Sequence, residues 1–268
     1  MLDADAPFLR VAISGTNRRK SHRLRVVVRS DVSPPSVWAD AAFGPIHRER
    51  LMISDDEAVL EHAPPTAPLH RYVSLFNVSG GCTVFSDGLA EYEAHDDGSV
   101  AITLVRAVGE LSRNGLPERP GHAGWPTPTT RAQCLGPFEA AFAVMLHGPR
   151  LAATMDDIER AADDVLCPLV GTTLRSALEV PTPVHGVELV GSGLAFSTLK
   201  ESESGGWLVL RCVNLRDDEV EGSWNLPFTP REAHLARLDE TIVSDVGASD
   251  RTIAFRAAPR AIVTVLVR

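Results

Sequence analysis

The 268-residue sequence lacks the short motifs that carry most enzyme chemistry. It contains no GxSxG nucleophile elbow, no HExxH zinc helix, no GxxxxGK[ST] phosphate loop and no GxGxxG turn between a strand and a helix. Its nine histidines are scattered, and none forms an HxH or HxxxH pair that could hold zinc. The sequence therefore offers no self-contained active site of these kinds.

Long apolar runs are also missing, and cysteine is sparse. No run approaches the roughly 20 residues of a membrane helix, and the acidic start MLDADAPFLR has no apolar leader. The four cysteines form no CxxC pair, and Cys82, Cys134 and Cys212 sit in apolar runs. Buried free thiols are therefore favoured over disulfides or metal ligands, which suits a cytoplasmic protein.

Positive charge is in deficit. The 26 Lys and Arg residues against 35 Asp and Glu residues give a net charge of -9. Because an acidic surface repels nucleic acid and anionic membranes, we expect neither as a partner. With 44% hydrophobic residues, the chain can form one large domain or two smaller ones.

Short apolar runs separated by turn residues make up most of the sequence. Runs rich in Val, Ile, Thr and aromatics predict strands at 8–14, 22–30, 69–77, 81–86, 98–106, 137–147, 185–190, 193–199, 206–215, 219–226, 232–238, 251–256 and 261–267. Asp87-Gly88 and Asp97-Gly98 indicate tight turns. Since no repeat of constant period is visible, β-sandwiches are favoured over a propeller or solenoid.

One helix is predicted, over residues 154–166. Thr154 and Asp157 resemble a capping box, and Pro168 ends the helix. An apolar stripe at helical spacing predicts a packed face, formed by Ile158, Ala161, Ala162, Val165 and Leu166.

These patterns predict an all-β protein with one α-helix between two parts. The first part, residues 1–170, is a large β-sandwich with a long loop at 107–135. A linker at 171–184 opens the second part, residues 171–268, which holds the remaining strands and a smaller β-sandwich.

Two places could bind a ligand. The loop 107–135 gathers Arg113, Arg119, His122, Trp125 and Arg131 among glycines and prolines. Trp offers a flat face to sugar C–H groups and Arg offers forked donors to hydroxyls. The alternative is a loop that only covers a sheet edge, with the Trp ring packed beneath it.

The second place is the segment GLAEYEA. Glu91 and Glu93 are two residues apart and so share one face of a strand, with Tyr92 on the other. The pair could address a groove, although an exposed sheet face has the same pattern. The other acid pairs, such as Asp96-Asp97 and Asp217-Asp218, lie in turns or on a helix surface and read as solvated.

Several segments, in this order, resemble the C-terminal region of glycoside hydrolase family 38, the retaining zinc-dependent α-mannosidases, and its bacterial branch in particular. They are HRLRVVV, ADAAFGPIHRER, VFSDGLAEYEAHDDGSVAITLVRAVGELSR, ERPGHAGWPTPTTRAQCLG, a strand ending in MLHG, and WLVLRCVN with its Arg-x-x-Asn. The resemblance covers approximately residues 8–268. It implies a supersandwich-like, galactose mutarotase-like fold for the large sandwich.

The resemblance also implies what this sequence does not contain. In the family, an N-terminal barrel supplies the aspartate nucleophile, the acid/base and the zinc ligands, and no segment here matches those motifs. We therefore expect no cofactor in this chain, zinc in the absent catalytic domain, and a chain that is inactive by itself. In relatives a loop at this position reaches the sugar site, so Arg113 or Arg119, with Gly121, His122, Gly124 and Trp125, would line its rim.

Three functions remain open at this point. The first is a non-catalytic part of an α-mannosidase-like enzyme, whose partners are a catalytic barrel, on the same or another chain, and a mannose-containing glycan. The second is a stand-alone carbohydrate-binding module that uses Trp125 or the Glu91/Glu93 face. The third is a structural or oligomerisation domain, and homo-oligomer formation is left open.

Overall fold

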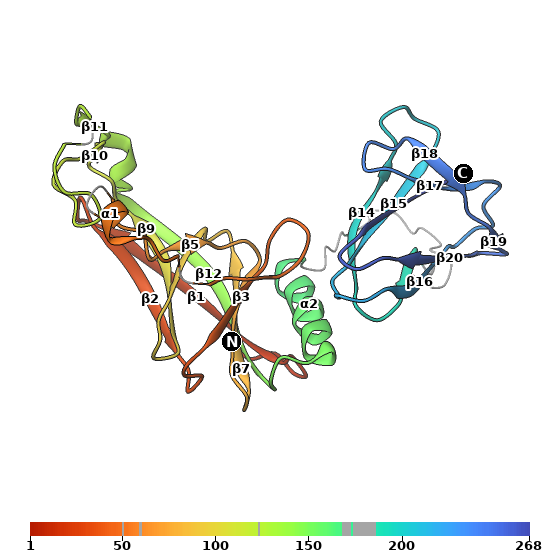
Figure 1. Ribbon diagram of the computed structural model, residues 1–268, viewed down its shortest axis with the longest axis horizontal. Helices are drawn as coiled ribbons and strands as arrows, with labels where there is room; N and C mark the ends of the chain where they lie inside the picture. Colours follow the sequence, from red (N-terminus) through yellow and green to blue (C-terminus); the bar gives the residue numbers. More distant parts are fainter. Residues whose placement is uncertain (50, 59–60, 123, 168–172, 174–185) are drawn as a thin grey trace. The chain divides into compact units, whose positions relative to one another are not determined.

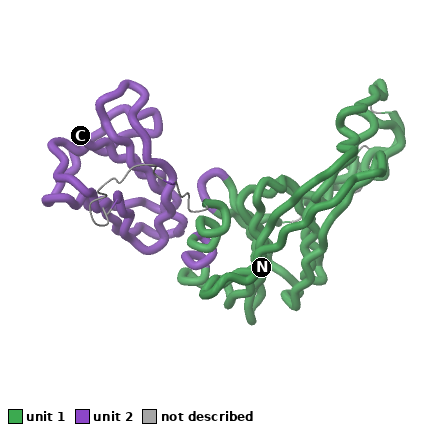
Figure 2. The backbone as a smooth tube through the Cα atoms, turned by 180° about the vertical axis from the view of Figure 1, so that it is seen from behind, with its two compact units in different colours: residues 1–41, 45–154, 160–167 green, residues 42–44, 155–159, 168–268 purple. Residues whose placement is uncertain are grey.

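The computed structural model describes residues 1–49, 51–58, 61–122, 124–167, 173 and 186–268 (Figure 1). The chain divides into two compact units (Figure 2). The first consists of residues 1–41, 45–154 and 160–167, and the second of residues 42–44, 155–159 and 168–268. The linker predicted at 171–184 lies outside the described residues, apart from residue 173.

Besides a two-stranded sheet in the loop 107–135, the described part of the first unit contains two larger antiparallel sheets. The larger sheet has the order β1 (Phe8–Asn17), β12 (Gly136–His147), β7 (Gly81–Asp87), β6 (Tyr72–Phe76), β3 (Ser36–Ala39) and β4 (Ile46–His47). The smaller sheet has the order β2 (Arg23–Arg29), β9 (Ser99–Arg106), β8 (Glu91–Ala94) and β5 (Ala67–Pro68). The predicted runs became strands, whereas the short strands β3, β4 and β5 carry too little pattern to be predicted.

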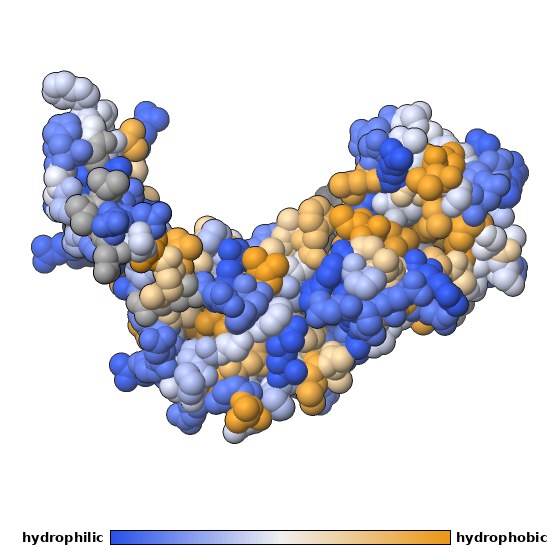
Figure 3. All heavy atoms as spheres, viewed as in Figure 1, coloured by the Kyte–Doolittle hydropathy of each residue, from blue (hydrophilic) through white to orange (hydrophobic). Residues whose placement is uncertain are grey.

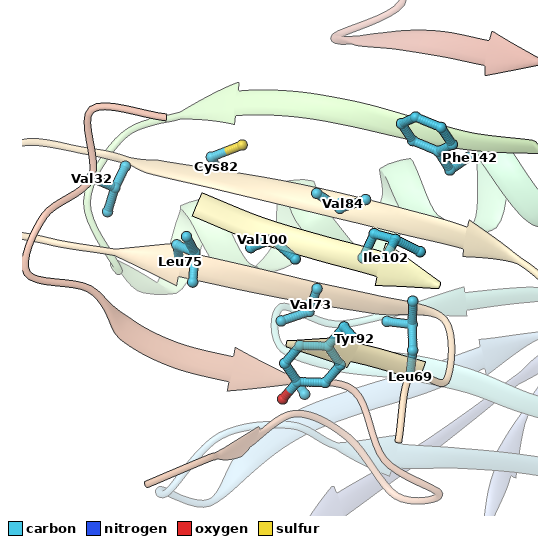
Figure 4. Close-up of a cluster of buried hydrophobic side chains, with 11 residues drawn as sticks. Val32, Leu69, Val73, Leu75, Cys82, Val84, Tyr92, Val100, Ile102 and Phe142 are labelled. Atoms are coloured by element: carbon cyan, nitrogen blue, oxygen red, sulfur yellow. The ribbon is translucent and has the colours of Figure 1, made fainter. Parts of the chain in front are cut away.

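The core of the first unit is an apolar cluster to which both sheets contribute (Figure 4). Val73, Leu75 and Val84 come from the large sheet, and Val100 and Ile102 come from β9 of the small sheet. Because the side chains of a strand alternate between its two faces, one face of each sheet supplies this cluster. Strand β9 is buried on both faces along most of its length.

Helix α2 (Ala152–Leu166) begins two residues earlier than predicted. The capping box at Thr154 and Asp157 is wrong: the N-cap is Leu151 in an extended conformation, with no side-chain cap. Ala153, a strong helix former, extends the helix past Thr154, whose hydroxyl therefore lies inside the first turn. The apolar stripe is confirmed, since Ile158 is fully buried and its neighbours on the stripe, Ala161, Ala162 and Val165, are buried as well.

A second, very short helix, α1 (Asp55–Ala58), was not predicted. Its capping box is formed by Ser54 and Glu57: the Glu57 N–H donates to Ser54 Oγ at 3.3 Å, and the Ser54 N–H donates to the Glu57 carboxylate at 3.1 Å. The bonds that the Ser54 N–H and the Ser54 hydroxyl donate to the carboxylate lower the pKa of Glu57. The S-x-x-E spacing of Ser54 and Glu57 was the sequence signal that could have predicted this helix start.

The second unit is a smaller sandwich of two antiparallel sheets. One has the order β13 (Glu188–Val190), β16 (Val220–Asn225), β20 (Thr252–Ala257) and β19 (Ala248–Ser249). The other has the order β14 (Leu194–Glu201), β15 (Leu208–Asn214), β21 (Ile262–Val267), β17 (Ala233–Ala236) and β18 (Ile242–Asp245). Its core centres on Trp224, Leu210 and Ile253. The all-β class, with two sandwiches, is confirmed.

The Arg-x-x-Asn segment of β15 builds structure in the second unit. The fully buried Asn214 donates through Nδ2 to the carbonyls of Asp218, Ala257 and Ala258, and its Oδ1 accepts the Arg216 N–H at 2.8 Å. These bonds hold the turn after β15 to the end of β20, so this motif is architectural rather than a ligand contact.

All four cysteines are free thiols, but only two are buried. Burial raises the pKa of Cys82 to about 11 and that of Cys212 to about 12. The expectation of burial is wrong for Cys134, which is exposed because it occupies a left-handed position, with φ 48°, at the end of a short 3-10 helix. Among the described residues no helix is long and apolar enough to cross a membrane.

Candidate functional site

The segment 107–135 is ordered at its base. Strand β10 (Glu110–Leu111) pairs with β11 (Thr127–Pro128), and a 3-10 helix, η1 (Thr130–Gln133), follows. The buried Gln133 side chain accepts the Ser21 N–H at 2.7 Å, and Asn17 Nδ2 donates to the Gln133 carbonyl at 3.1 Å. The loop is therefore anchored to the end of β1 and the chain after it, and only its tip is free to carry a binding surface.

The tip of this loop presents its polar and aromatic side chains to solvent. Trp125 is 87% exposed, His122 three residues before it is exposed, and so is Arg113 in the first half of the loop. The packed alternative is therefore wrong for the Trp ring. The Gly124 N–H donates to His122 Nδ1 at 3.1 Å, so the ring accepts through that nitrogen. The end of the first unit that carries β10 and β11 is mainly hydrophilic in Figure 3.

Arg119 differs from Arg113, because it ties the tip to the neighbouring segment. Its Nη1 lies 4.0 Å from Glu61 Oε2, and the His62 N–H donates to the Glu118 carbonyl at 2.6 Å. The Arg119 Nε is buried and has no hydrogen-bond partner in the described part of the chain. Arg113 is thus exposed, while Arg119 lies within ion-pair distance of Glu61.

Glu91 and Glu93 lie on one face of β8, and Tyr92 lies on the other. Glu91 accepts from Thr103 Oγ1 at 2.7 Å and lies 3.5 Å from both Arg23 and Arg106. Glu93 pairs with Arg25, and His95 Nδ1 is 3.9 Å from its other oxygen. Both carboxylates are thus engaged across β2, β9 and β8.

The candidate residues therefore fall into two separate places. The loop tip carries Arg113, Arg119, His122 and Trp125, whereas Glu91 and Glu93 belong to a charged sheet face. Within the described residues, the hydrogen bonds and ion pairs of the two glutamates go to Thr103, His95 and the arginines of β2 and β9.

Two further features, a buried ion-pair cluster and a cavity, were not predicted from the sequence. Asp40, with a side chain that is fully buried, accepts from Arg71 Nε at 2.9 Å and Nη2 at 3.0 Å, and from His70 Nδ1 at 2.6 Å. The second feature is a cavity of about 630 Å³, and Tyr92 and Arg48 are among the residues that line it. The only sequence signal for the cavity was the proline-rich stretch 63–68.

No metal site is found in the residues that the structure describes, because no group of three or more His, Cys, Asp or Glu side chains is arranged to hold an ion. The family resemblance places zinc in the catalytic domain rather than in this chain.

Comparison with known proteins agrees with the resemblance noted in the sequence. Residues 193–265 match the sequence model of the glycosyl hydrolases family 38 C-terminal beta sandwich domain. Over 214 residues, 80% of this chain, the sequence is 30% identical to a "Putative mannosylglycerate hydrolase" of Halalkalibacterium halodurans, of which it covers 22%.

Two solved structures from Enterococcus faecalis share the fold. A protein of glycosyl hydrolase family 38 superposes with a TM-score of 0.76 at 22% identity, over 98% of this chain and 28% of that one. An α-mannosidase from strain V583 superposes with a TM-score of 0.75 at 23% identity, over 98% of this chain and 27% of that one. The chain thus spans between a fifth and a third of the length of these relatives.

Proposed function

Since the chain carries the C-terminal β-sandwich region of glycosyl hydrolase family 38, we propose that it is the non-catalytic part of a mannoside-cleaving enzyme. Its sandwiches support a catalytic barrel, and the tip of loop 107–135 lines the sugar site of that barrel. The family match to a C-terminal domain is the observation that carries this proposal. The substrate class follows from the relatives, which are named as a "Putative mannosylglycerate hydrolase" and an α-mannosidase.

The arrangement of the carboxylates supports a non-catalytic role. A glycosidase needs two carboxyl groups that flank one bond and are free to exchange a proton or attack carbon. Glu91 and Glu93, the best-spaced pair in the sequence, are instead held by arginines of the same sheet. We assign the reacting carboxylates and the zinc of the family to the barrel.

The loop tip supports the second half of the proposal. An exposed Trp on a loop that also carries exposed Arg and His, and whose base is anchored, is a typical sugar-contacting surface. In the assembled enzyme Trp125 and Arg113 would contact the substrate, His122 would donate from Nε2, and Arg119 would keep the tip in place.

An activity assay tests the proposal directly. The purified chain is incubated with an aryl α-mannoside and with mannosylglycerate, with and without zinc, and the Enterococcus faecalis α-mannosidase serves as the positive control. We expect product formation equal to the protein-free background. Hydrolysis that rises in proportion to the concentration of this chain would sink the proposal.

A second candidate function, a stand-alone carbohydrate-binding module, is favoured by the 87% exposure of Trp125. Calorimetry with mannosides and mannose oligosaccharides separates it from a part that binds only when assembled. Binding that disappears in Trp125→Ala supports the module, and the absence of measurable binding to any of these sugars counts against it.

A further inference from the structure

We propose that the first unit pairs with a second copy of this chain through the outer edge of strand β1 (Phe8–Asn17). β1 is the last strand of the large sheet, where it pairs with β12 in a continuous register (Figure 1). On the side away from β12, the Met1 ammonium donates to the Arg10 carbonyl at 2.7 Å, and the Arg10 N–H donates to the Met1 carbonyl at 2.9 Å. Among the described residues, Met1 is the one backbone partner on this edge.

The rest of this edge is available to another strand. Backbone groups of alternate residues point to the same side of a strand, so those of Ala12, Ser14 and Thr16 point away from β12, as those of Arg10 do. All three residues are exposed, and no backbone hydrogen bond reaches this side of them from the described part of the chain. Their N–H and C=O groups therefore form a template to which an extended segment can add as a further strand.

The other long edge strands carry features that discourage such pairing, and β1 does not. Edge strand β2 carries Arg25 and Arg29 and has a register shift against β9. Edge strand β14 has a register shift against β15 and carries Lys200. Residues 11–17 of β1, by contrast, read VAISGTN and contain neither a charged residue nor a proline. Because charged side chains and bulges are the devices that keep edge strands apart, β1 has the character of an edge that pairs.

A second copy fits this edge because the strand is self-complementary. A two-fold axis at Ser14, the middle of the available stretch, places Ala12 of each copy opposite Thr16 of the other in an antiparallel pair. Ser14 then meets its own counterpart, and each outward-facing pair exchanges two backbone hydrogen bonds, which gives about six in all. Ile13 lies opposite Gly15, so that a large side chain has the smallest residue as its neighbour.

Pairing also covers apolar side chains at the rim of the core. Val11 and Ile13 pack against the buried cluster of the first unit but stay only partly buried, whereas Val73 and Val84, in the middle of the same sheet, are fully buried. In the two-fold arrangement Ile13 of both copies lies on one face of the joined sheet. The apolar area that is removed from water there adds to the backbone hydrogen bonds.

Charges beyond the two ends of the available stretch favour the antiparallel arrangement. The basic turn 18–20 (Arg-Arg-Lys) follows β1 directly and is exposed. In the dimer it approaches the Arg10 end of the other copy, where Arg10 is itself paired with Asp3 at 3.4 Å. Asp5 and Asp164 are exposed at that end, and Asp164 is placed there by its carbonyl, which accepts from Arg10 Nη2 at 2.7 Å. A parallel pair would instead bring the two basic turns together.

Sedimentation velocity on the whole chain tests the dimer. Between about 1 and 200 µM we expect a monomer–dimer equilibrium with a dissociation constant of roughly 1–100 µM, since one strand edge is a small interface. Ser14→Pro removes an N–H that points away from β12, so the pairing with β12 is kept while the two bonds on the axis are lost. Its dissociation constant should rise at least about tenfold. Ser14→Ala keeps the N–H and is the matched control, with a change of less than about twofold.

Disulfide trapping tests the register. Ser14→Cys and Ala12→Cys are each made in a Cys134→Ser, Cys167→Ser background, which removes the exposed native thiols. Across the axis the Cα atoms of residue 14 are about 5.5 Å apart, within disulfide range, whereas those of residue 12 are roughly 14 Å apart. Mild oxidation should therefore link Ser14→Cys into a covalent dimer and leave Ala12→Cys monomeric on a non-reducing gel.

Three results would overturn the inference. They are a chain that stays monomeric at about 200 µM, a Ser14→Pro variant that dimerises as well as the native chain, and equal trapping of the two cysteine variants. The last two results would place any dimer on another surface. If Ser14→Pro does not fold, the cysteine pair decides alone, because both of its members keep the backbone N–H. The readout is the assembly state rather than hydrolysis or sugar binding, so the inference fails or succeeds separately from the proposed function.

Discussion

Two buried polar side chains differ in their hydrogen bonding: Asn214 in the second unit and Tyr92 in the first. The carboxamide of Asn214 is fully engaged, with three carbonyl acceptors at 2.8–3.1 Å and one N–H donor at 2.8 Å. The hydroxyl of Tyr92 is as well shielded from solvent but has no partner among the described residues. The structural role of a buried polar group is therefore ambiguous until its hydrogen bonds are counted, and the count separates a group that holds a turn in place from one that the described residues leave without a partner.

The largest effect is expected for Asn214→Ala. The substitution leaves three carbonyls and one N–H without their side-chain partner, so we expect the free energy of unfolding to fall by about 3 kcal/mol. Urea denaturation of the purified chain measures it. Asn225→Ala, on the neighbouring strand β16, is the matched control and should cost about 1 kcal/mol or less, since its bonds go to the side chains of Glu188 and Thr252. Equal losses in the two variants would contradict the structural role of Asn214.

The ion pairs on the opposite face of β8 should contribute less. A double-mutant cycle with Arg25→Ala and Glu93→Ala is expected to give a coupling free energy of about 0.5–1 kcal/mol, because both side chains are only partly buried. Chemical denaturation at low and high salt provides the measurement, and the coupling should shrink with salt. A coupling of zero would mean that Glu93 is not held by Arg25.

The buried, hydrogen-bonded ring of His147 should make the free energy of unfolding depend on pH. Its Nε2 accepts from Thr83 Oγ1 at 2.8 Å and its Nδ1–H donates to the Gly148 carbonyl at 2.9 Å, while burial lowers the pKa of the ring. The unfolded state therefore binds the proton more readily, and stability falls as the pH drops through the ordinary histidine range, near 6.5. We expect His147→Gln to lose less stability than the native chain between pH 7.5 and 5.5. Identical losses would show that His147 is not the group responsible.

Tyr92→Phe should have the smallest effect on folding. Because the hydroxyl has no partner within the described residues, removing it should change the free energy of unfolding by less than about 0.5 kcal/mol, in either direction. Urea denaturation beside Asn214→Ala makes the comparison direct. A loss that approaches that of Asn214→Ala would remove the distinction between the two sites.

The sequence predicted most of the strands but only part of the candidate site. Strands such as 98–106 and 261–267 carry long β-branched runs, and the prediction was accurate there because local pattern and burial agree. The start of α2 was misplaced, since Thr154 matched a capping signature that tertiary structure did not use. A capping motif specifies a local hydrogen bond, and two alanines before it were enough to move the helix start.

The site was harder to predict because hydrogen-bond partners come from distant strands. Glu91 and Glu93 share a face, as their spacing indicated, but nothing in the local sequence showed that Arg23, Arg25 and Arg106 would engage them. The pocket beside Tyr92 escaped notice for the same reason, since its walls come from four separated segments. Sequence spacing predicts which face of a strand a side chain lies on. Pairing with residues of distant strands decides whether that side chain remains available to a ligand.

One proton NMR experiment tests the central claim, which is that this chain is a non-catalytic part and does not cleave mannosides. The chain is mixed with mannosylglycerate and zinc, and the appearance of free mannose is followed over time. The account predicts no free mannose above the protein-free control. Accumulation of free mannose in proportion to the chain would contradict it.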